Sequence, residues 1–313
     1  MDTKLKLGRF AKYAWIVLAY NVVVILWGVF LRASKSGDGC GQHWLTCHGE
    51  VIPSAPELKT VIEFSHRLTS GLAFIAVLVL LVWAFRKFPK GDAIRKTAFV
   101  SFIFIITEAL VGAGLVLTGN TAETLTAARP FWMIGHLTNT FILLAFLTLT
   151  AWFASGGKTF DLKNAQPKVL LFLLIALTGI FLVGMSGSVA ALSSMLFPSA
   201  TISEGIAKDF SATSNILLRL RISHPILSIM TSVFLIFLAG WLRKNSNGSF
   251  WVTRWSNLLS ILILIQIAFG ALTLLTLAPI LMQLGHLFLA DAVWISFVLL
   301  SASFLAENQY SER

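Results

Sequence analysis

The sequence predicts an all-α polytopic membrane protein with eight transmembrane helices, and three observations lead to that fold class. Hydrophobic residues make up 57% of the 313 residues and charged residues only 12%, a composition that a soluble domain could not bury. The apolar residues fall into eight runs of about 20 residues, the length that a hydrocarbon core of about 30 Å requires. Positive residues gather in alternate loops between these runs, as membrane topology demands.

The eight expected helices are separated by short polar segments. They span residues 13–31, 64–85, 97–118, 132–154, 168–190, 219–242, 255–276 and 281–305. The last two are nearly continuous, because only the Ala278-Pro279 step interrupts them and proline stops a helix. The first run follows a basic arm but lacks a small-residue cleavage site, so we expect a transmembrane helix there and not a removed signal peptide.

The distribution of lysine and arginine predicts the orientation in the membrane. The N-terminal arm and the second, fourth and sixth loops carry Lys4, Lys6, Arg9, Lys12, Arg86, Lys87, Lys90, Arg95, Lys96, Lys158, Lys163, Lys168, Arg243, Lys244 and Arg254. The positive-inside rule places these loops and both termini in the cytoplasm of a cell membrane. The net charge of +10 therefore indicates contact with anionic lipid and not with nucleic acid.

The longest outward-facing loop, residues 32–63, contains both cysteines. Cys40 and Cys47 lie on the predicted oxidising side, in a glycine-containing loop short enough to bring them within bonding distance. We expect a disulfide, which would be either a structural staple or a redox pair that passes electrons to a site beneath it. A surface metal site involving His43 and His48 is a third interpretation, and the spacing does not separate the three.

Three ionisable residues stand at the edge of the second apolar run. Glu63, His66 and Arg67 share one helix face, because they are spaced by three and four residues. Charge at the edge of a membrane span is costly, so the cluster is a candidate functional site. A Glu–Arg pair capping a membrane helix beside a hydrogen-bonded histidine is the alternative.

Every even-numbered span carries one histidine near its predicted outer end. These are His66, His136, His224 and His286, each about one to two helical turns inside the boundary. A single buried histidine is usually a hydrogen-bonded core residue. Four at matched depth on alternate helices favour axial ligation of haem iron by facing imidazoles. A structural zinc site is less consistent, because it needs four ligands that converge on one point.

The two halves of the chain repeat each other. The Ser-His pair at 65–66 recurs at 223–224, and Gly-His-Leu at 135–137 recurs at 285–287. The third repeated motif pairs residues 108–113, which begin with Glu108, with residues 266–271, which begin with Gln266. Each half has four spans, so the halves share one orientation and we expect a pseudo-twofold axis along the membrane normal.

The repeat predicts two four-helix bundles, residues 1–160 and 161–313. Glu63 precedes His66 by three residues, but Arg221 occupies the equivalent place before His224. Only the N-terminal bundle therefore keeps a carboxylate beside its histidines. This asymmetry is what a catalytic half joined to an electron-carrying half would show.

These motifs resemble the haem A synthase family. The resemblance rests on Glu63-x-x-His66-Arg67, the Gly-His motifs at His136 and His286, His224, and the cysteine-containing outer loop, and it covers essentially the whole chain. It implies an oxidoreductase that converts a ring methyl of haem O to the formyl group of haem A for terminal oxidases. It also implies haem O synthase and terminal oxidase assembly factors as partners, with an electron donor or acceptor, and it leaves homo-oligomers open.

The resemblance also implies residue roles. His224 and His286 would be the axial ligands of a haem b cofactor, and His66 and His136 would bind the substrate haem. Glu63 would be the catalytic acid. The cysteine pair of the family corresponds to Cys40 and Cys47, whereas the resemblance assigns nothing to His43 and His48.

Other polar residues near the membrane boundary keep two interpretations each. Arginine side chains at the level of the histidines either bind haem propionates or extend to the interface: Arg67, Arg129, Arg219 and Arg221. Glu108 and Asp291, inside the third and eighth spans, are either proton-path groups or hydrogen-bonded buried acids.

Two functions without catalysis remain as alternatives. One is a two-haem cytochrome b, which would usually carry two histidines per helix about 14 residues apart and stack its haems across the membrane. The other is a haem or metal transporter, for which the repeat alone is neutral.

Overall fold

The structure, a computed structural model, describes residues 7–121, 123–160 and 162–311, which form helices and loops without any β-strand. The elements are α1 (Arg9–Ala33), α2 (Leu58–Lys87), α3 (Ala93–Leu117), α4 (Arg129–Ala154), η1 (Leu162–Asn164), α5 (Pro167–Leu196), α6 (Ile202–Phe210), α7 (Ile216–Leu220), α8 (Ser223–Lys244), α9 (Phe250–Leu275) and α10 (Ile280–Ser311). Eight spans are long and apolar enough to cross a membrane, with α7 and α8 together forming the sixth. The predicted multi-pass all-α fold is confirmed. Lys4 and Lys6, used in the topology prediction, lie outside the described residues.

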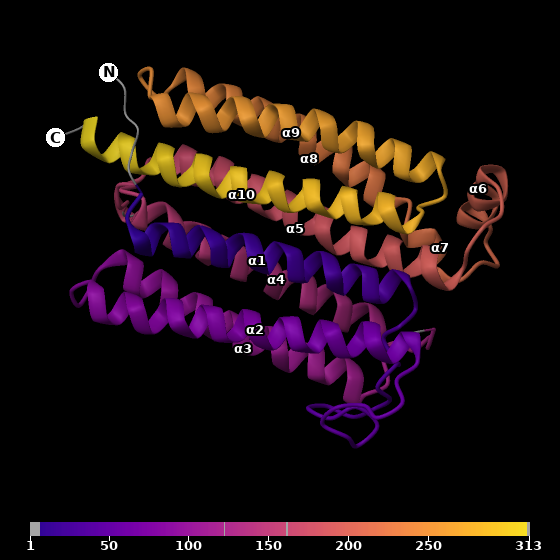
Figure 1. Ribbon diagram of the computed structural model, residues 1–313. Helices are drawn as coiled ribbons and strands as arrows, with labels where there is room; N and C mark the ends of the chain where they lie inside the picture. The colour runs from indigo at the N-terminus through magenta and orange to yellow at the C-terminus, as the bar shows by residue number, and fades with distance from the viewer. Residues whose placement is uncertain (1–6, 122, 161, 312–313) are drawn as a thin grey trace.

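The helices alternate in direction, so all loops that follow odd-numbered spans meet at one end of the molecule. Figure 1 shows the start of α1 and the end of α10 at one end, with α6 and the α1–α2 loop at the other. We call the second end the outer end. The third span of each half begins with a capping side chain: Asp92 accepts from Ile94 N at 2.7 Å before α3, and Ser249 accepts from Val252 N at 3.3 Å before α9.

Several of the expected spans were too short, as α2 and α5 illustrate. Helix α2 begins at Leu58, six residues before the expected start, so Glu63 and Arg67 lie inside the helix and not at its mouth. Helix α5 continues to Leu196, six residues past the expected end. Hydropathy detects the hydrocarbon thickness, whereas a helix such as α2, whose first turn carries Lys59, continues into the polar interface.

The sixth span, expected as one helix over 219–242, is broken in two. Helix α7 ends at Leu220 and α8 begins at Ser223, immediately before His224. Pro225 explains the break, because its ring lacks an N–H and clashes with the carbonyl of Arg221 four residues earlier. The histidine of this span therefore lies in the first turn of a new helix.

The fifth loop, expected to be an irregular Ser- and Thr-rich segment, contains the short helix α6. Thr201 caps it by accepting from Glu204 N at 3.2 Å. Ile202, Ile206 and Phe210 lie along one face of α6 and are all exposed. An apolar face at the outer end of a membrane protein is suited to the membrane interface.

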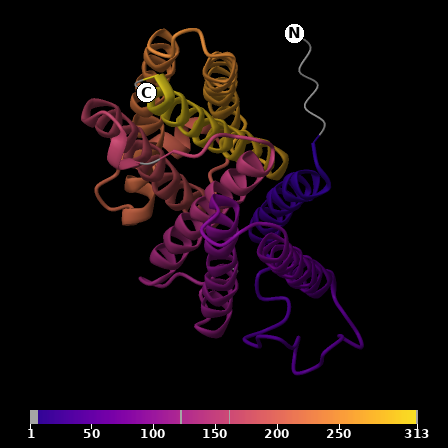
Figure 2. The ribbon, with the colours of Figure 1, turned by 90° about the vertical axis from the view of Figure 1, so that its left-hand side faces the viewer.

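The spans form two groups, which Figure 2 shows from the end that carries the start of α1. In the first group, α1 packs on α2 and α4, and α3 packs on α2 and α4. In the second, α8 packs on α5 and α9, and α9 packs on α10. Contacts of α4 with α5 and of α10 with α4 and α1 join the groups. The arrangement fits the predicted repeat of two four-helix units.

The interface between the two groups contains the best-buried helices. In α4 and in α10, 56% of an apolar 18-residue stretch is buried. The corresponding share is 33% or less in every other span. Trp294 on α10 stacks on Phe141 of α4 and donates its Nε1–H to the Phe141 carbonyl at 2.8 Å. Arg32 of α1 also donates to Gln283 Oε1 of α10 at 3.2 Å. These contacts fix two of the four histidine-bearing helices.

Candidate functional site

The four predicted histidines lie at similar depth below the outer end. His66 follows the start of α2 by eight residues and His136 follows the start of α4 by seven. His224 follows the start of its span at Ile216 by eight residues, and His286 follows the start of α10 by six. At 1.5 Å per helical residue the offsets of His66, His136 and His286 are about 9–12 Å, slightly deeper than the sequence indicated.

His224 and His286 face each other in the second group. Their ring centroids are 6.2 Å apart with the planes at 88°. Two metal–nitrogen bonds of about 2 Å, plus about 1 Å from each nitrogen to its ring centre, give a separation of about 6 Å. The Nδ1 atom of His224 lies 3.2 Å from the carbonyl oxygen of Val183 and 3.3 Å from Ser186 Oγ, which leaves Nε2 available. The pair therefore fits a metal held between two imidazoles.

Three of the four histidine rings rest against a glycine on a neighbouring helix. A Cβ atom would come within 2.9 Å of His224 Cε1 at Gly187, and within 2.9 Å of His286 Cε1 at Gly270. A Cβ at Gly28 would come within 3.0 Å of His66 Cε1. Any larger residue there would displace the ring. Gly28 and Gly187 were not predicted as site residues, and Gly270 stood out only as part of the repeat.

The histidines of the first group have unused nitrogen atoms. The Nδ1 atoms of His66 and His136 are buried and have no hydrogen-bond partner among the described residues, and the same holds for His286. A buried ring nitrogen without a partner is costly, so an additional group that orients the ring would stabilise these sites. Each histidine pair offers two ligands, which suits a haem because the porphyrin itself fills the equatorial positions of the iron.

Glu108 of α3 lies beside His136. Its Oε1 atom is 3.4 Å from His136 Nδ1, within ion-pair distance although no hydrogen bond forms in this geometry. Thr140 Oγ1 donates to the same carboxylate at 2.5 Å, and Asn139 Nδ2 donates to its other oxygen. Thr107 Oγ1 in turn donates to Asn139 Oδ1 at 2.5 Å. Of the two interpretations of Glu108, the structure shows the hydrogen-bonded acid.

Gln266 occupies the position equivalent to Glu108 in the second group. It donates from Nε2 to the backbone carbonyl of His286 at 3.1 Å, and its Oε1 atom is buried without a partner among the described residues. The two groups therefore differ in charge at matching places: a carboxylate beside His136 and a neutral amide beside His286.

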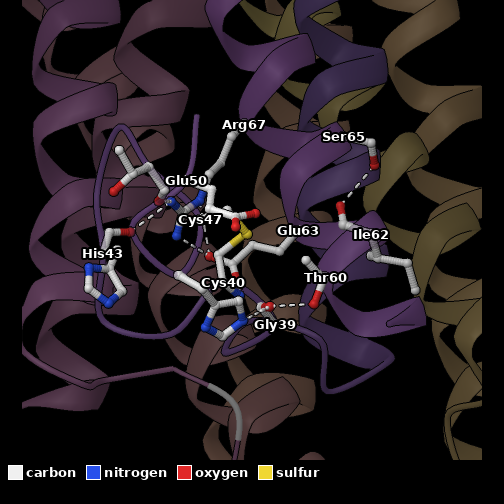
Figure 3. Close-up of a disulfide and its surroundings, with 12 residues drawn as sticks. Gly39, Cys40, His43, Cys47, Glu50, Thr60, Ile62, Glu63, Ser65 and Arg67 are labelled. Atoms are coloured by element: carbon white, nitrogen blue, oxygen red, sulfur yellow. Dashed lines mark hydrogen bonds and ion pairs between the residues drawn. A yellow bond between two sulfur atoms is a disulfide. The ribbon is translucent and has the colours of Figure 1, made fainter. Parts of the chain in front are cut away.

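Glu63 is buried, with an exposed fraction of 2%, and its carboxylate has protein partners. It forms an ion pair with Arg67, and the backbone N–H of Cys40 donates to Glu63 Oε2 at 2.8 Å. Arg67 Nη1 also donates to the carbonyl oxygens of His43 and Thr46 at 2.7 and 2.8 Å. Figure 3 shows Cys40, Glu63 and Arg67 close together where the outer loop folds back on α2. A buried carboxylate with a cation and an N–H donor is held in one position.

The predicted disulfide between Cys40 and Cys47 is present, with the two Cα atoms 4.4 Å apart. The loop backbone also lies directly on α2: a Cβ at Gly39 would come within 2.3 Å of the Lys59 backbone. Thr60 Oγ1 donates to the Gly39 carbonyl at 2.6 Å. The disulfide and these contacts together place the Cys40 N–H against Glu63.

Two further polar contacts lie in the outer loops, and one buried acid lies within α10. A ring nitrogen of His48 lies 2.9 Å from the Gly39 carbonyl oxygen. Across the outer loops Lys35 pairs with Glu123, and its hydrogen bond lowers the pKa of that carboxyl. Asp291 is buried in α10, and neither carboxylate oxygen has a partner among the described residues.

The arginines proposed for propionate binding have protein partners or exposed positions. Arg67 pairs with Glu63, and Arg221 pairs with Asp209 and donates to the Gly205 carbonyl at 3.1 Å. Arg129 is buried and donates to the carbonyl of Thr124. Arg219 is exposed on α7.

Comparisons with known proteins support a common origin for the whole arrangement. The chain is 45% identical over 298 residues to a protein named protoheme IX farnesyltransferase from one strain of Thermus thermophilus, covering 95% of this chain and 49% of the relative. The counterpart from a second strain of the same species is 44% identical over the same length. The chain therefore spans about half the length of these relatives.

Shorter matches carry another name. A heme A synthase from Halalkalibacterium halodurans is 42% identical over 98 residues, which is 31% of this chain and 33% of the relative. A heme A synthase from Alkalihalophilus pseudofirmus is 36% identical over 117 residues, covering 37% of this chain and 39% of the relative. A family model described as cytochrome oxidase assembly protein matches residues 11–298, a range that includes all four histidines, Glu63 and both cysteines. The chain belongs to this family, COX15-CtaA, of cytochrome oxidase assembly proteins.

Proposed function

We propose that this protein is a haem A synthase, an oxidoreductase that converts a ring methyl of haem O to the formyl group of haem A. One observation carries the proposal: two histidine pairs lie at one depth in two repeated groups of helices, and the first group has a buried carboxylate, Glu63, three residues before its histidine where the second has Arg221. Family membership and the heme A synthase relatives support it.

We assign the two groups, residues 1–160 and 161–313, to different haems. His224 and His286 would hold a haem b cofactor, because their separation suits axial ligation. His66 and His136 would bind haem O next to Glu63. The iron supplies the redox chemistry that side chains lack. The lack of a side chain at Gly28, Gly187 and Gly270 leaves room for the rings of His66, His224 and His286.

The chain's own contribution to the reaction centres on Glu63. The Arg67 guanidinium and the Cys40 N–H hold its carboxylate in one position at the outer end of α2. With water as the source of the formyl oxygen, conversion of a methyl to a formyl group releases four protons and four electrons. Glu63 would accept protons as a general base, and an external electron acceptor would take the electrons. The loop over residues 34–57 covers Glu63 and keeps bulk water away from it.

The proposed setting is a cell membrane, with both termini in the cytoplasm and the haem sites near the outer face. The positive-inside rule supports this orientation. Haem O would arrive from haem O synthase through the lipid phase, and haem A would pass to terminal oxidase assembly factors. An electron acceptor completes the reaction.

The proposal is tested by expressing the chain in a host that makes haem O but no haem A. Mass spectrometry of the extracted haems should show haem A or its hydroxylated intermediate only in cells with the intact protein. Haem O that remains unchanged beside a fully haem-loaded protein would refute the assignment and favour an electron carrier or a transporter.

The names of the Thermus relatives favour a second candidate, farnesyl transfer to protohaem IX. The same measurement in a host that lacks haem O synthase separates the two. New haem O would support farnesyl transfer, whereas unchanged haem b is the result that the first proposal predicts.

A further inference from the structure

We propose that Glu108 is a positioning residue for His136, which accepts the Nδ1–H of that ring and so directs Nε2 at the iron of the substrate haem. The proposal rests on the proposed function, which places a haem iron at His136. It goes further by assigning the two haems different electronic environments, set by Glu108 in one group and by Gln266 in the other.

The carboxylate of Glu108 accepts two hydrogen bonds and can accept a third. Thr140 and Asn139 donate to its two oxygen atoms, one on each, and both come from the helix that carries His136. The third polar neighbour is His136 Nδ1 at 3.4 Å from Oε1. A carboxylate inside a membrane span is costly unless its oxygens are satisfied, so a short rotation of the ring toward Glu108 is favourable.

His136 in turn has nothing else to donate to among the described residues. Its Nδ1 is buried without a hydrogen-bond partner there, whereas the Nδ1 of His224 already lies near the Val183 carbonyl. Histidine ligands of metals almost always donate their second ring N–H to a carboxylate or carbonyl, which fixes the tautomer and raises the basicity of the ligand. Glu108 supplies the carboxylate form of this partner.

Gln266 gives the second group a neutral amide where the first group has the carboxylate of Glu108. It occupies the repeat position of Glu108 but uses its amide to bond the His286 backbone, and it carries no charge. A more basic axial ligand stabilises oxidised iron, so second-sphere hydrogen bonding is one of the means by which a protein tunes haem potential. The N-terminal haem should therefore have the lower potential for an otherwise equal ligand pair.

The test exchanges the two residues in the full-length protein. Glu108→Gln removes the carboxylate from the first site, and Gln266→Glu introduces one at the second. Haem b is added to purified protein, and midpoint potentials are measured by spectroelectrochemical titration with low-spin electron paramagnetic resonance spectra in parallel. A His286→Ala background isolates the N-terminal haem, and a His136→Ala background isolates the C-terminal haem.

We expect Glu108→Gln to raise the midpoint potential of the N-terminal haem and to leave the C-terminal haem unchanged. Gln266→Glu should lower the potential of the C-terminal haem. Equal potentials before and after Glu108→Gln, at full haem loading, would overturn the proposal. If Glu108→Gln fails to load haem, Gln266→Glu decides: a lowered potential supports the proposal and an unchanged one overturns it.

The outcome is separate from that of the proposed function. Reciprocal shifts in potential without conversion of haem O would leave the role of Glu108 intact and refute the synthase. Conversion of haem O by a protein whose potentials do not respond to either substitution would do the opposite.

Discussion

At the scale of single residues, Glu63 distinguishes the two halves of the molecule. It is buried, ion-paired with Arg67 and bonded to the loop through Cys40. We expect Glu63→Gln to keep its haem b and to lose at least about 100-fold in haem A formation, because general acid–base groups typically contribute that much. The measurement is haem A formed per cofactor haem b in the purified variant.

A purely structural role for Glu63 predicts a different result. Breaking a buried ion pair costs about 3–5 kcal/mol, so yield, melting temperature and haem content would fall together. Glu50→Gln is the matched control, because Glu50 lies in the loop that covers Glu63 but is exposed, and its side chain bonds only Ser54 among the described residues. Near-normal turnover in Glu63→Gln would refute a catalytic role.

The glycines beside the histidines give a second prediction at this scale. A Val at position 187 would place its Cβ within 2.9 Å of His224 Cε1, so the ring must move and axial ligation should be lost. We expect Gly187→Val to purify with much less haem b than the parent protein. Gly240→Ala is the control, since nothing lies within 4 Å of a Cβ there. Equal haem content in both variants would contradict the prediction.

Sequence patterns located most of these residues but not the glycines. The histidines, Glu63 and the cysteines stand out because ionisable or reactive groups are rare in apolar runs. A glycine in a membrane span has no such contrast, because glycine is common there. The importance of Gly187 comes from a neighbouring helix, and one sequence does not reveal which residue that helix presents.

At the scale of elements, the loop over residues 34–57 covers Glu63 and supplies a hydrogen bond to it. We expect Cys40 and Cys47 to resist thiol reagents until the protein is reduced. Reduction should then increase cleavage of this loop by added protease, because closing a loop of this size stabilises it by about 2–3 kcal/mol. Labelling of both cysteines without reduction would contradict the disulfide.

Substitution of the two cysteines tests the role of the disulfide. Haem A formation that survives Cys→Ala substitution at positions 40 and 47 would leave the bridge as a structural staple. Loss of activity with retained haem would show that the loop must be fixed for Glu63 to act.

Element boundaries were harder to predict than element number. The number of spans follows from hydrophobic length, which the sequence shows directly. The early start of α2 and the helix α6 depend on polar residues at the interface, where hydropathy gives no contrast. The break before His224 was predictable in principle, because Pro225 is visible, although proline is also tolerated within membrane helices.

At the scale of the whole molecule, the chain divides between α4 and α5. We expect a protease site inserted after Gly157 to be cut without separating the two groups of helices, because α1, α4, α5 and α10 pack together across the division. After cleavage in detergent, the fragments should co-elute on size exclusion and the haem b spectrum should persist. Separation of the fragments, or loss of haem on cleavage, would contradict the packed interface between the groups at 1–160 and 161–313.

The repeat was predictable because its short motifs occur in the same order in both halves of the chain. The contacts between the halves, such as Trp294 with Phe141 and Arg32 with Gln283, involve residues outside those motifs. Nothing in their local sequence specifies a partner more than 150 residues away, so the way in which the halves join could come only from the structure.

The placement of all four histidines at one end leads to an expectation about how the proposed reaction responds to membrane voltage. Polar side chains of the opposite half, such as Thr148 and Ser303, bond carbonyls of their own helices within a packed apolar core. Electrons, protons and haem would then enter and leave at the same depth. A charge moved across the full membrane would couple by about 2.3 kcal/mol per 100 mV. We therefore expect turnover in sealed vesicles to be electroneutral, with the same rate whether the membrane is polarised or short-circuited by an ionophore.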